Sequence, residues 1–295
     1  MVVAAQDARA TIGRCLEGLE RQRPGSLGQV ILVDNSSDGT AEYVRQRFPS
    51  VEVVERTGRA LIPELWGAGI LRSSGEIVAL TTAQMVPDKQ WAQALLQEYA
   101  RHSWAGVGGV ILPAPKLSLP DQAVYWLRYG RYARRTAVGA VGDIPGDNAS
   151  YRRAQLLPFA ERIRREGFWE NEVHALLHRR GARLCAAPEA TVRYHGGTRF
   201  ARFARQRLAH GRRFGAQRIV GLGPARRVLL VAVWPFTPLA FLARICRDAL
   251  GAGGGGSLVR ALPALLCLLM CWSLGELLGY LSAGPKGDSG CPETA

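Results

Sequence analysis

The sequence lacks several features that would assign it to common classes of protein. Only 3 of its 295 residues are lysine, although lysine and arginine together number 38 and exceed the 24 acidic residues, for a net charge of +14. The six cysteines form no Cys-x-x-Cys pair, which excludes a zinc ribbon and a dithiol redox motif. No Gly-x-Gly-x-x-Gly follows the first apolar run, which argues against a dinucleotide-binding domain.

The N-terminus lacks a charged segment followed by a long apolar run. We therefore expect no secretory signal peptide and expect the catalytic part to stay in the cytosol, where unpaired cysteines are common. Hydrophobic residues make up 47% and charged residues 21% of the chain, so its composition is not that of a disordered protein.

Up to about residue 227 the sequence alternates short apolar runs with helical patterns. The expected strands are Val2–Ala5, Gln29–Val33, Val51–Val54, Ile77–Thr81 and Gly106–Ile111. The expected helices are Thr11–Glu20, one around 41–48, one starting near Pro63, and then Asp88–Arg101, Asp121–Tyr132 and Trp169–Arg180, with Asp88 as a helix cap. Alternation of this kind predicts βαβ units and a mainly parallel sheet.

The C-terminal part is different in character. Residues 199–227 contain nine arginines and no acidic residue, and they form a basic amphipathic segment. Residues 228–283 contain two apolar stretches joined by a glycine-rich connector, and a polar tail follows at 284–295. The second stretch is long enough to cross a bilayer, which needs about 20 residues. We therefore predict a membrane helical hairpin beside anionic lipid, with two buried helices of a soluble core as the alternative.

The topology of this hairpin stays open. Two crossings would place Arg244, Arg247 and Arg260 on the outer side, against the positive-inside tendency. A shallow hairpin that does not cross removes this conflict, and in either case Glu276 is expected to face protein or headgroups rather than lipid tails.

The strongest local signal is the segment VILVDNSSDGT. Asp34 directly follows an apolar strand, and ligands bind at the carboxyl ends of strands in open parallel sheets. A carboxylate in this position could accept hydrogen bonds from a base or a ribose. The alternative is a turn in which Asp38 or Thr40 caps the next helix.

The order of several segments resembles the family 2 glycosyltransferases. These segments are CLEGLERQ, VILVDNSSDGT, SSGEIVALTTAQMVPDKQW, GDNASYRR, FWENEVHALLHRRGARL and RYH. The resemblance implies a GT-A domain over residues 1–215. This is a Rossmann-like α/β fold whose mixed, mainly parallel sheet is flanked by helices, and it transfers sugars from nucleotide donors with inversion.

By this resemblance Asp34 would contact the donor base, usually uracil, beside Gln6 and Asp7. The family's Asp-x-Asp motif binds Mg²⁺ or Mn²⁺, but Thr82 and Gln84 stand at the matching positions. The usual metal site is therefore doubtful, although a metal stays possible. The candidates to neutralise the leaving diphosphate instead are His195, Arg207, His210 and Arg212. A structural role is the alternative for the histidines, and contact with lipid phosphate is the alternative for the arginines.

The resemblance also implies the catalytic acids. Counting back from Gly181, the family's base falls on Glu170 and its second acid on Glu172, in the first turn of a helix. Acids there could instead only stabilise the helix dipole. Asp147 and Asn148 match a segment that borders the acceptor, with turn chemistry as the alternative.

Three functions remain at this point. The first is transfer of a sugar, from a UDP-sugar by preference, to a lipid-linked or cell-envelope glycan at the cytoplasmic membrane. The second is a degenerate, non-catalytic relative that binds a nucleotide or a partner at the membrane. The third is nucleic-acid binding through the positive charge, which we do not expect because the arginines gather beside apolar segments.

Overall fold

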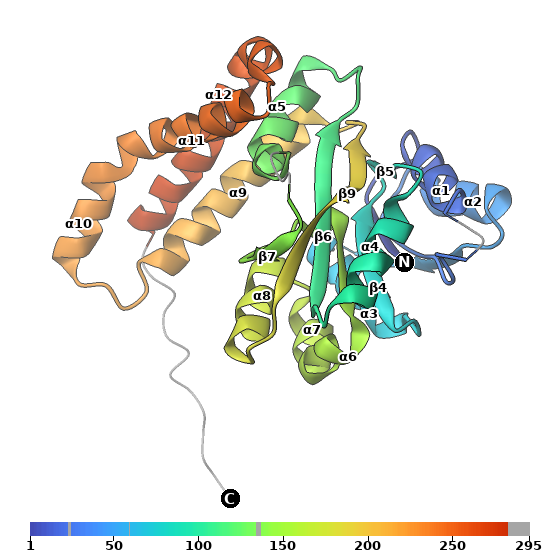
Figure 1. The fold of residues 1–295 in the computed structure, drawn as a ribbon. Helices are drawn as coiled ribbons and strands as arrows, with labels where there is room; N and C mark the ends of the chain where they lie inside the picture. The colour runs from blue at the N-terminus through green and yellow to red at the C-terminus, as the bar shows by residue number, and fades with distance from the viewer. Residues whose placement is uncertain (23–24, 59, 134–136, 283–295) are drawn as a thin grey trace, which may run out of the picture. The chain divides into compact units, whose positions relative to one another are not determined.

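The structure is a computed structural model that describes residues 1–22, 25–58, 60–133 and 137–282. The predicted polar tail at 284–295 and Cys291 lie outside the described residues. The described chain forms two compact units (Figure 1). Unit 1 comprises Met1–Leu117 and Tyr129–Gly197, and unit 2 comprises Ser118–Arg128 and the residues from Thr198 onward. The predicted domain boundary at residue 215 therefore falls inside a helix of unit 2.

Unit 1 contains a nine-stranded sheet within the described residues. Its strands are β1 (Val2–Ala5), β2 (Ile31–Asp34), β3 (Glu52–Glu55), β4 (Ile77–Thr82), β5 (Met85–Pro87), β6 (Gly106–Pro113), β7 (Gly139–Val141), β8 (Ala149–Arg152) and β9 (Leu184–Tyr194). The order is β3-β2-β1-β4-β8-β6-β9-β5, with β7 also paired to β9.

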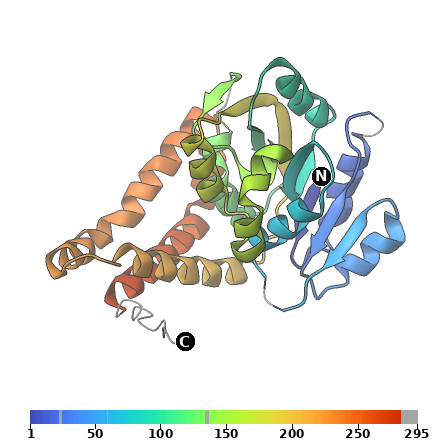
Figure 2. The same ribbon diagram turned by 90° about the horizontal axis from the view of Figure 1, so that it is seen from below.

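The first four strands of this order pair in parallel, as do β6 and β9, and Figure 2 shows the sheet from below. The antiparallel strand β8 then lies between β4 and β6, and β5 and β7 pair antiparallel with β9. The predicted mixed sheet flanked by helices is confirmed. The strands up to β4 and β6 lie within a few residues of their predicted positions.

Helices cover both faces of the sheet. The helices of unit 1 are α1 (Ile12–Glu20), α2 (Thr40–Arg47), α3 (Ile62–Arg72), α4 (Trp91–Arg101), α6 (Arg153–Leu156), α7 (Ala160–Glu166) and α8 (Glu170–Arg179). Helix α3 packs on β1, β2 and α7, while α4 packs on β6 and β9. Alternate side chains of the central strands therefore face different helices.

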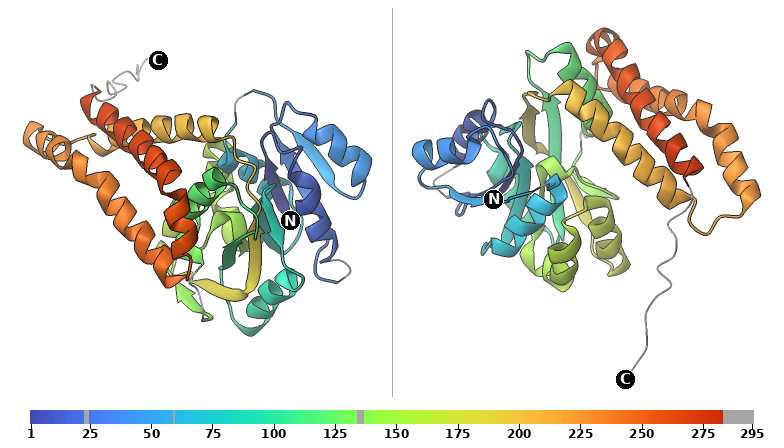
Figure 3. Two further views of the ribbon diagram at one scale, coloured as in Figure 1. Left: turned by 90° about the horizontal axis from the view of Figure 1, so that it is seen from above. Right: turned by 180° about the vertical axis from the view of Figure 1, so that it is seen from behind.

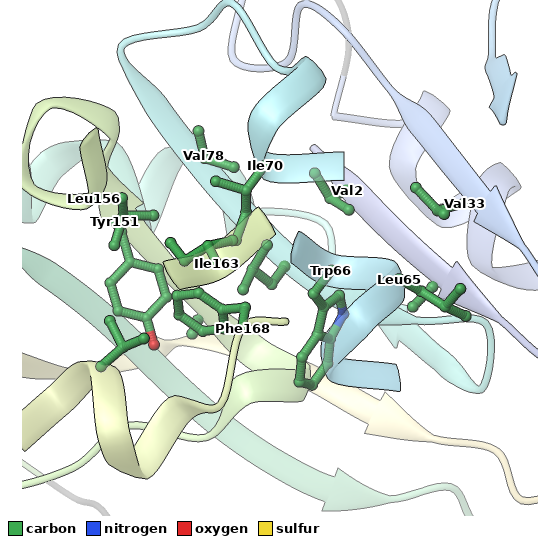
Figure 4. Packing of buried hydrophobic residues seen from close by; sticks show 14 of the residues in the cluster. Val2, Val33, Leu65, Trp66, Ile70, Val78, Tyr151, Leu156, Ile163 and Phe168 are labelled. Atoms are coloured by element: carbon green, nitrogen blue, oxygen red, sulfur yellow. The ribbon is translucent and has the colours of Figure 1, made fainter. Parts of the chain in front are cut away.

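The core on the α3 side joins distant parts of unit 1 (Figure 4). Trp66 and Ile70 of α3, Tyr151 of β8, Ile163 of α7 and Phe168 are all buried in one cluster. The rings of Tyr151 and Phe168 lie 5.2 Å apart, edge to face. This packing fixes β8 and the start of α8 relative to the parallel strands.

One local prediction in this unit is wrong. Helix α4 begins at Trp91 with Gln90 as its cap residue, so Asp88 is not the cap. The Asp88 carboxylate instead accepts two hydrogen bonds from the Arg193 guanidinium, at 3.1 and 3.3 Å. An ion pair across 105 residues leaves no trace in the local pattern around Asp88.

Unit 2 is helical in its described residues. Its helices are α5 (Leu119–Arg128), α9 (Phe200–Arg218), α10 (Pro224–Val233), α11 (Thr237–Gly251) and α12 (Gly255–Leu281). Figure 3 shows α9 and α12 side by side, and these two helices share the most extensive contact in the unit. The stretches Pro224–Gly251 and Gly255–Leu281 are long and apolar enough to cross a membrane by length and composition alone.

Four glycines bring α9 and α12 into backbone contact. Gly211 and Gly215 of α9 face Gly275 and Gly279 of α12. A Cβ atom on these residues, in that order, would lie 2.2, 2.2, 2.1 and 2.4 Å from a carbonyl oxygen of the other helix. Each helix therefore presents two glycines, four residues apart, to the other helix. They permit a close approach of the two helix backbones that any larger residue would prevent.

The same contact holds the one acid of α12. The Glu276 side chain is 1% exposed and accepts hydrogen bonds from Arg218 of α9, at 3.2 Å, and from the Tyr280 hydroxyl. Glu276 therefore faces protein, as we expected, and its charge is matched by the neighbouring helix.

We predict opposite effects of one substitution at two helical glycines of unit 2. Gly211→Ala should destabilise the protein by about 1–3 kcal/mol, because the new Cβ overlaps the Trp272 carbonyl. Gly256→Ala should leave the protein equally stable or slightly more stable, because the space around this α12 position is open and alanine favours a helix. Thermal unfolding of the detergent-solubilised variants measures both. Equal midpoints for the two would contradict the close contact of α9 and α12.

Candidate active site

The parallel strands end at one edge of the sheet, and polar residues gather there. Ala5 at the end of β1 pairs with Asp34 at the end of β2, and Ala4 pairs with Thr82 at the end of β4. Gln6 follows directly after β1. Gln6, Asp34 and Thr82, three of the residues predicted to contact the nucleotide, therefore come from the ends of adjacent strands.

Asp34 is the buried carboxylate of this edge. It is 2% exposed, and its Oδ1 accepts a hydrogen bond from the Ser36 hydroxyl. Burial raises its pKa, and the nearby charges of Asp38 and Glu55 raise it further. The Asp38 carboxylate accepts a hydrogen bond from the Thr40 N–H at 3.3 Å, but the cap residue of α2 is Gly39 and the helix begins at Thr40. Neither Asp38 nor Thr40 is therefore the cap residue, and the contact of Asp34 with a donor base stays a prediction.

The segment after β1 is held in an unusual backbone conformation. Asp7 has a φ of 47°, in the left-handed region that residues other than glycine rarely adopt. Its Oδ1 accepts a hydrogen bond from the Ser37 N–H at 3.2 Å, and the Gln6 amide donates to the Ala60 carbonyl. Strained backbone of this kind concentrates at binding sites, where the surrounding structure maintains it.

Thr82 connects this edge to the segment before β8. Its hydroxyl donates to Asp147 Oδ1 at 2.7 Å, and the Thr81 hydroxyl donates to the Asp147 carbonyl at 2.9 Å. Gln84 lies two residues on, in the turn before β5, where its carbonyl accepts from the His195 N–H at 2.9 Å. The structure thus brings Thr82, Gln84, Asp147 and His195 together at the end of β4.

These residues do not form a typical site for a hard divalent cation. Thr82 and Gln84 carry no charge, and the Thr82 hydroxyl is already bonded to Asp147. Among the residues that the structure describes, no group of three or more His, Cys, Asp or Glu side chains could hold a metal ion. Mg²⁺ and Mn²⁺ favour carboxylate oxygens, so the donor set present here does not fit them.

Positive charge is present beside His195. Burial lowers the pKa of His195, and the neighbouring Arg14 and Arg193 lower it further. Arg14 belongs to α1 and is exposed. Sequence reasoning missed it because no recognisable motif surrounds it, whereas its approach to His195 depends on the packing of α1 near β5 and β9.

Glu170 lies in the first turn of α8, against the Asp147 segment. A Cβ atom on Gly146 would lie 1.8 Å from Glu170 Oε2, so the carboxylate occupies the space that only glycine leaves open. The pKa values of Tyr132 and Tyr151 are raised chiefly by burial, and the charge of Glu170 adds to both shifts. Glu170 therefore lies close to Asp147, the residue that accepts a hydrogen bond from Thr82. The buried side chains of Tyr132 and Tyr151 are near enough to Glu170 for its charge to act on them.

The other predicted acid of this helix is placed differently. Glu172 is half exposed, and its carboxylate is paired with Arg162 of α7 at 2.5 Å. His174, the i+4 neighbour of Glu170, is buried and forms a 2.8 Å hydrogen bond with the Tyr151 hydroxyl. Tyr151 and His174 thus fix α8 to β8 behind Glu170.

Asn148 is a structural link in this arrangement. It is fully buried, and its amide nitrogen donates to the carbonyls of Val110 at 2.9 Å and Ala190 at 2.8 Å. Its Oδ1 accepts from the Trp91 indole at 2.7 Å. The side chain thereby joins β6, β9 and α4, and its role toward an acceptor stays a prediction.

The remaining predicted residues belong to unit 2. Arg207, His210 and Arg212 all lie on α9. The Arg207 guanidinium lies over the Trp272 ring at 4.2 Å, and Arg212 is exposed.

Comparison with known proteins identifies the family. The model of the family described as "Glycosyl transferase family 2" matches residues 1–157, slightly more than half of the chain. No curated protein is significantly similar to the sequence.

Solved structures share the fold at low sequence identity. The structure of the mannosyltransferase PcManGT from Pyrobaculum calidifontis, in complex with GDP-Man and Mn²⁺, is 20% identical, with a TM-score of 0.54 over 94% of this chain and 86% of that one. S. aureus TarS 1–349 is 13% identical, with a TM-score of 0.51 over 93% and 89%. GalNAc-T7 with UDP, GalNAc and Mn²⁺ is 13% identical, with a TM-score of 0.50 over 65% and 43%. The chain has the GT-A fold and belongs to glycosyltransferase family 2.

Proposed function

We propose that this glycosyltransferase transfers a sugar, with inversion, from a nucleotide donor to a hydroxyl of a lipid-linked or cell-envelope glycan. The observation that carries the proposal is the position of the Glu170 carboxylate over Gly146. The adjacent Asp147 bonds Thr82, at the edge where Asp34 also ends its strand. A base and a nucleotide site therefore share one edge of the sheet.

The donor occupies the carboxyl ends of β1, β2 and β4 in this proposal. Asp34 accepts a hydrogen bond from the imide N–H of uracil, and Gln6 and Thr82 line the same pocket. A UDP-sugar fits because uracil offers a donor to a carboxylate. Two structural neighbours form complexes with GDP-Man and with UDP, which agrees with a nucleotide donor in general.

Chemistry requires one bond to break and one to form. The acceptor oxygen attacks the anomeric carbon from the side opposite the diphosphate, while the carbon–oxygen bond to the diphosphate breaks. Glu170 takes the proton of the acceptor hydroxyl, and the electron pair leaves with the nucleoside diphosphate. Asp147 lies next to Gly146 and contacts the acceptor, and Glu172 remains a predicted second acid at the exposed side of α8.

The leaving diphosphate gains negative charge that the protein must stabilise. Because the donor set does not fit the family's cation, we assign this role to groups of the chain itself. Gln84 and His195 lie at the end of β4, and Arg14 and Arg193 act on His195. Fixed cations and hydrogen-bond donors can supply such stabilisation in an enclosed site.

Membrane association is proposed for unit 2, with the catalytic unit at the cytoplasmic side. In an 18-residue apolar window of Pro224–Gly251 only 6% of the residues are buried within the protein, whereas the share in the corresponding window of Gly255–Leu281 is 39%. Helix α12 is covered in part by α9, which is rich in arginine. We therefore assign the main lipid contact to α10 and α11, in a shallow arrangement that does not require arginine to enter the bilayer.

We predict that Glu170→Gln abolishes transfer but preserves donor binding. The amide cannot accept the acceptor proton, and a general base contributes about 10²- to 10⁴-fold to rate. Turnover of a radiolabelled UDP-sugar, measured beside nucleotide binding, tests this. Glu161→Gln is the matched control, because Glu161 is an exposed acid of α7 and should keep full activity. A Glu170→Gln enzyme with full activity would refute the assignment.

Gly146→Ala should reproduce much of this loss without changing a charge. Its Cβ would overlap Glu170 Oε2 and force the carboxylate to move. A displacement of about 1 Å can cost about 10²-fold in rate. Gly142→Ala, in open space on the same segment, should have little effect on kcat. Equal activities for the two variants would show that Glu170 does not need its observed position.

A nucleoside diphosphate should raise the unfolding temperature of the solubilised protein, in EDTA as well as in Mn²⁺. Ligand at about 100 times its Kd stabilises the folded state by about 2.7 kcal/mol. UDP should act more strongly than GDP. Stabilisation that requires Mn²⁺ would contradict the cation-free site, and binding without any turnover would favour the degenerate, non-catalytic alternative.

A further inference from the structure

Unit 2 contains a cluster of basic side chains that we call the α9 cluster. It consists of Arg207, His210 and Arg213 of α9, together with Arg128 at the end of α5. All four lie within unit 2; Arg128 acts electrostatically on Arg207, and Arg128, Arg207 and Arg213 act on His210.

Arg207 is the centre of this cluster. Its guanidinium is stacked on the Trp272 ring at 4.2 Å, which fixes its plane. Its Nε is buried and has no hydrogen-bond partner among the residues that the structure describes. Burial lowers the pKa of Arg207 to about 10, and the charge of Arg128 contributes to the shift. A buried, oriented N–H donor without an acceptor costs free energy unless a ligand supplies one.

His210 gives the same indication from the next turn of α9. Burial lowers its pKa, and Arg207, Arg213 and Arg128 lower it further. Within the described part of the chain, the charged side chains that lower the pKa values of Arg207 and His210 are arginines. Positive charge therefore gathers around these two side chains.

Arg218 on the same helix provides a contrast. It is bonded to Glu276, so α9 can pair an arginine with an acid of α12 where it needs only internal stability. The α9 cluster instead faces α12 through the neutral ring of Trp272. An arginine over an aromatic ring still presents a planar fork of N–H donors, which suits the oxygens of a phosphate group.

We propose that the α9 cluster binds a phosphate group carried by a lipid, with Arg207 as its main ligand and His210 and Arg213 as further donors. The cluster lies on the helix that precedes the apolar stretch Pro224–Gly251 and packs on α12, so a phosphate at the membrane surface is the available anion. This site deepens the proposed function, on which it rests, because it selects a phosphate-linked lipid as acceptor. It also moves Arg207 and His210 from the donor diphosphate, where the resemblance placed them.

The test is binding of the full-length, detergent-purified protein to vesicles by flotation. One set of vesicles is pure phosphatidylcholine, one contains about a tenth polyprenyl phosphate, and one contains phosphatidylglycerol at equal surface charge. Arg207→Gln should weaken binding to the two anionic vesicle types by about tenfold, the effect of losing one charge-assisted hydrogen bond. Arg205→Gln removes the same charge from an exposed position of the same helix and should change binding less than twofold.

Arg213→Gln provides a second variant that does not depend on a buried side chain. Arg213 is exposed, so the variant should fold normally. It should still weaken binding to the two anionic vesicle types by a few-fold. Loss for polyprenyl phosphate alone assigns the site to the acceptor lipid, and equal loss for both anionic vesicles assigns it to ordinary phospholipid. Equal binding by Arg207→Gln and Arg205→Gln on both anionic vesicles overturns the proposal, as does an equal loss on pure phosphatidylcholine.

Nucleotide binding and transfer, measured on the same preparations, separate the two proposals. Intact transfer with no difference between the Arg207 and Arg205 variants would overturn the phosphate site and leave the transferase function standing. A tenfold loss of phosphate-lipid binding in a protein that never transfers sugar would support the site and refute the proposed function. Competition by a single-stranded oligonucleotide, equal to that by polyprenyl phosphate, would indicate a nucleic-acid ligand and overturn the lipid assignment.

Discussion

The hydrogen bond from the Thr82 hydroxyl to Asp147 Oδ1 joins the two halves of the catalytic unit. Thr82 ends the parallel strand β4, and Asp147 lies in the short turn before the antiparallel strand β8. Because β8 lies directly beside β4, the glycine before Asp147 meets the first turn of α8 and admits the Glu170 carboxylate. The distance between the proposed donor edge and the proposed base is thus set by strand pairing and one glycine, which are rigid features.

The same bond occupies a position where the family uses a charged ligand. A threonine hydroxyl at the end of β4 can donate to a buried carboxylate, whereas an aspartate there would oppose Asp147 with like charge. The replacement of the family's acids by Thr82 and Gln84 is therefore compatible with the position of the Asp147 carboxylate beside Thr82. In the cation-free site that we propose, the positive groups around His195 become more important, because a bound divalent ion would otherwise dominate the local field.

How far the sequence predicts this protein depends on how local each feature is. Strands β1 to β4 and β6 follow from apolar runs of the chain, and Asp34 follows from its place after one of them. The sequence does not predict strands β5, β7 and β8, which exist through pairing with strands that are distant along the chain. The roles of Asp88 and Asn148 failed to emerge for the same reason, since Arg193, Val110 and Ala190 are far away in sequence. Glu170 was found by its distance from Gly181, but the open space at Gly146 that receives it is visible only in three dimensions.

The direction of two helices in unit 2 bears on which apolar stretch meets lipid. The contacts of Gly211 and Gly215 with α12 advance along both helices together, so α9 and α12 run parallel. The chain between them must return along the unit, and α10 and α11 make that return with only Ile245 and Ala249 buried. Helix α12, by contrast, is bound to α9 by glycine contacts and by the Glu276–Arg218 pair, which lipid tails would not satisfy. Because the parallel helix α9, which carries the arginines, covers α12, α12 lies inside unit 2. Helices α10 and α11 then form the apolar surface of the unit.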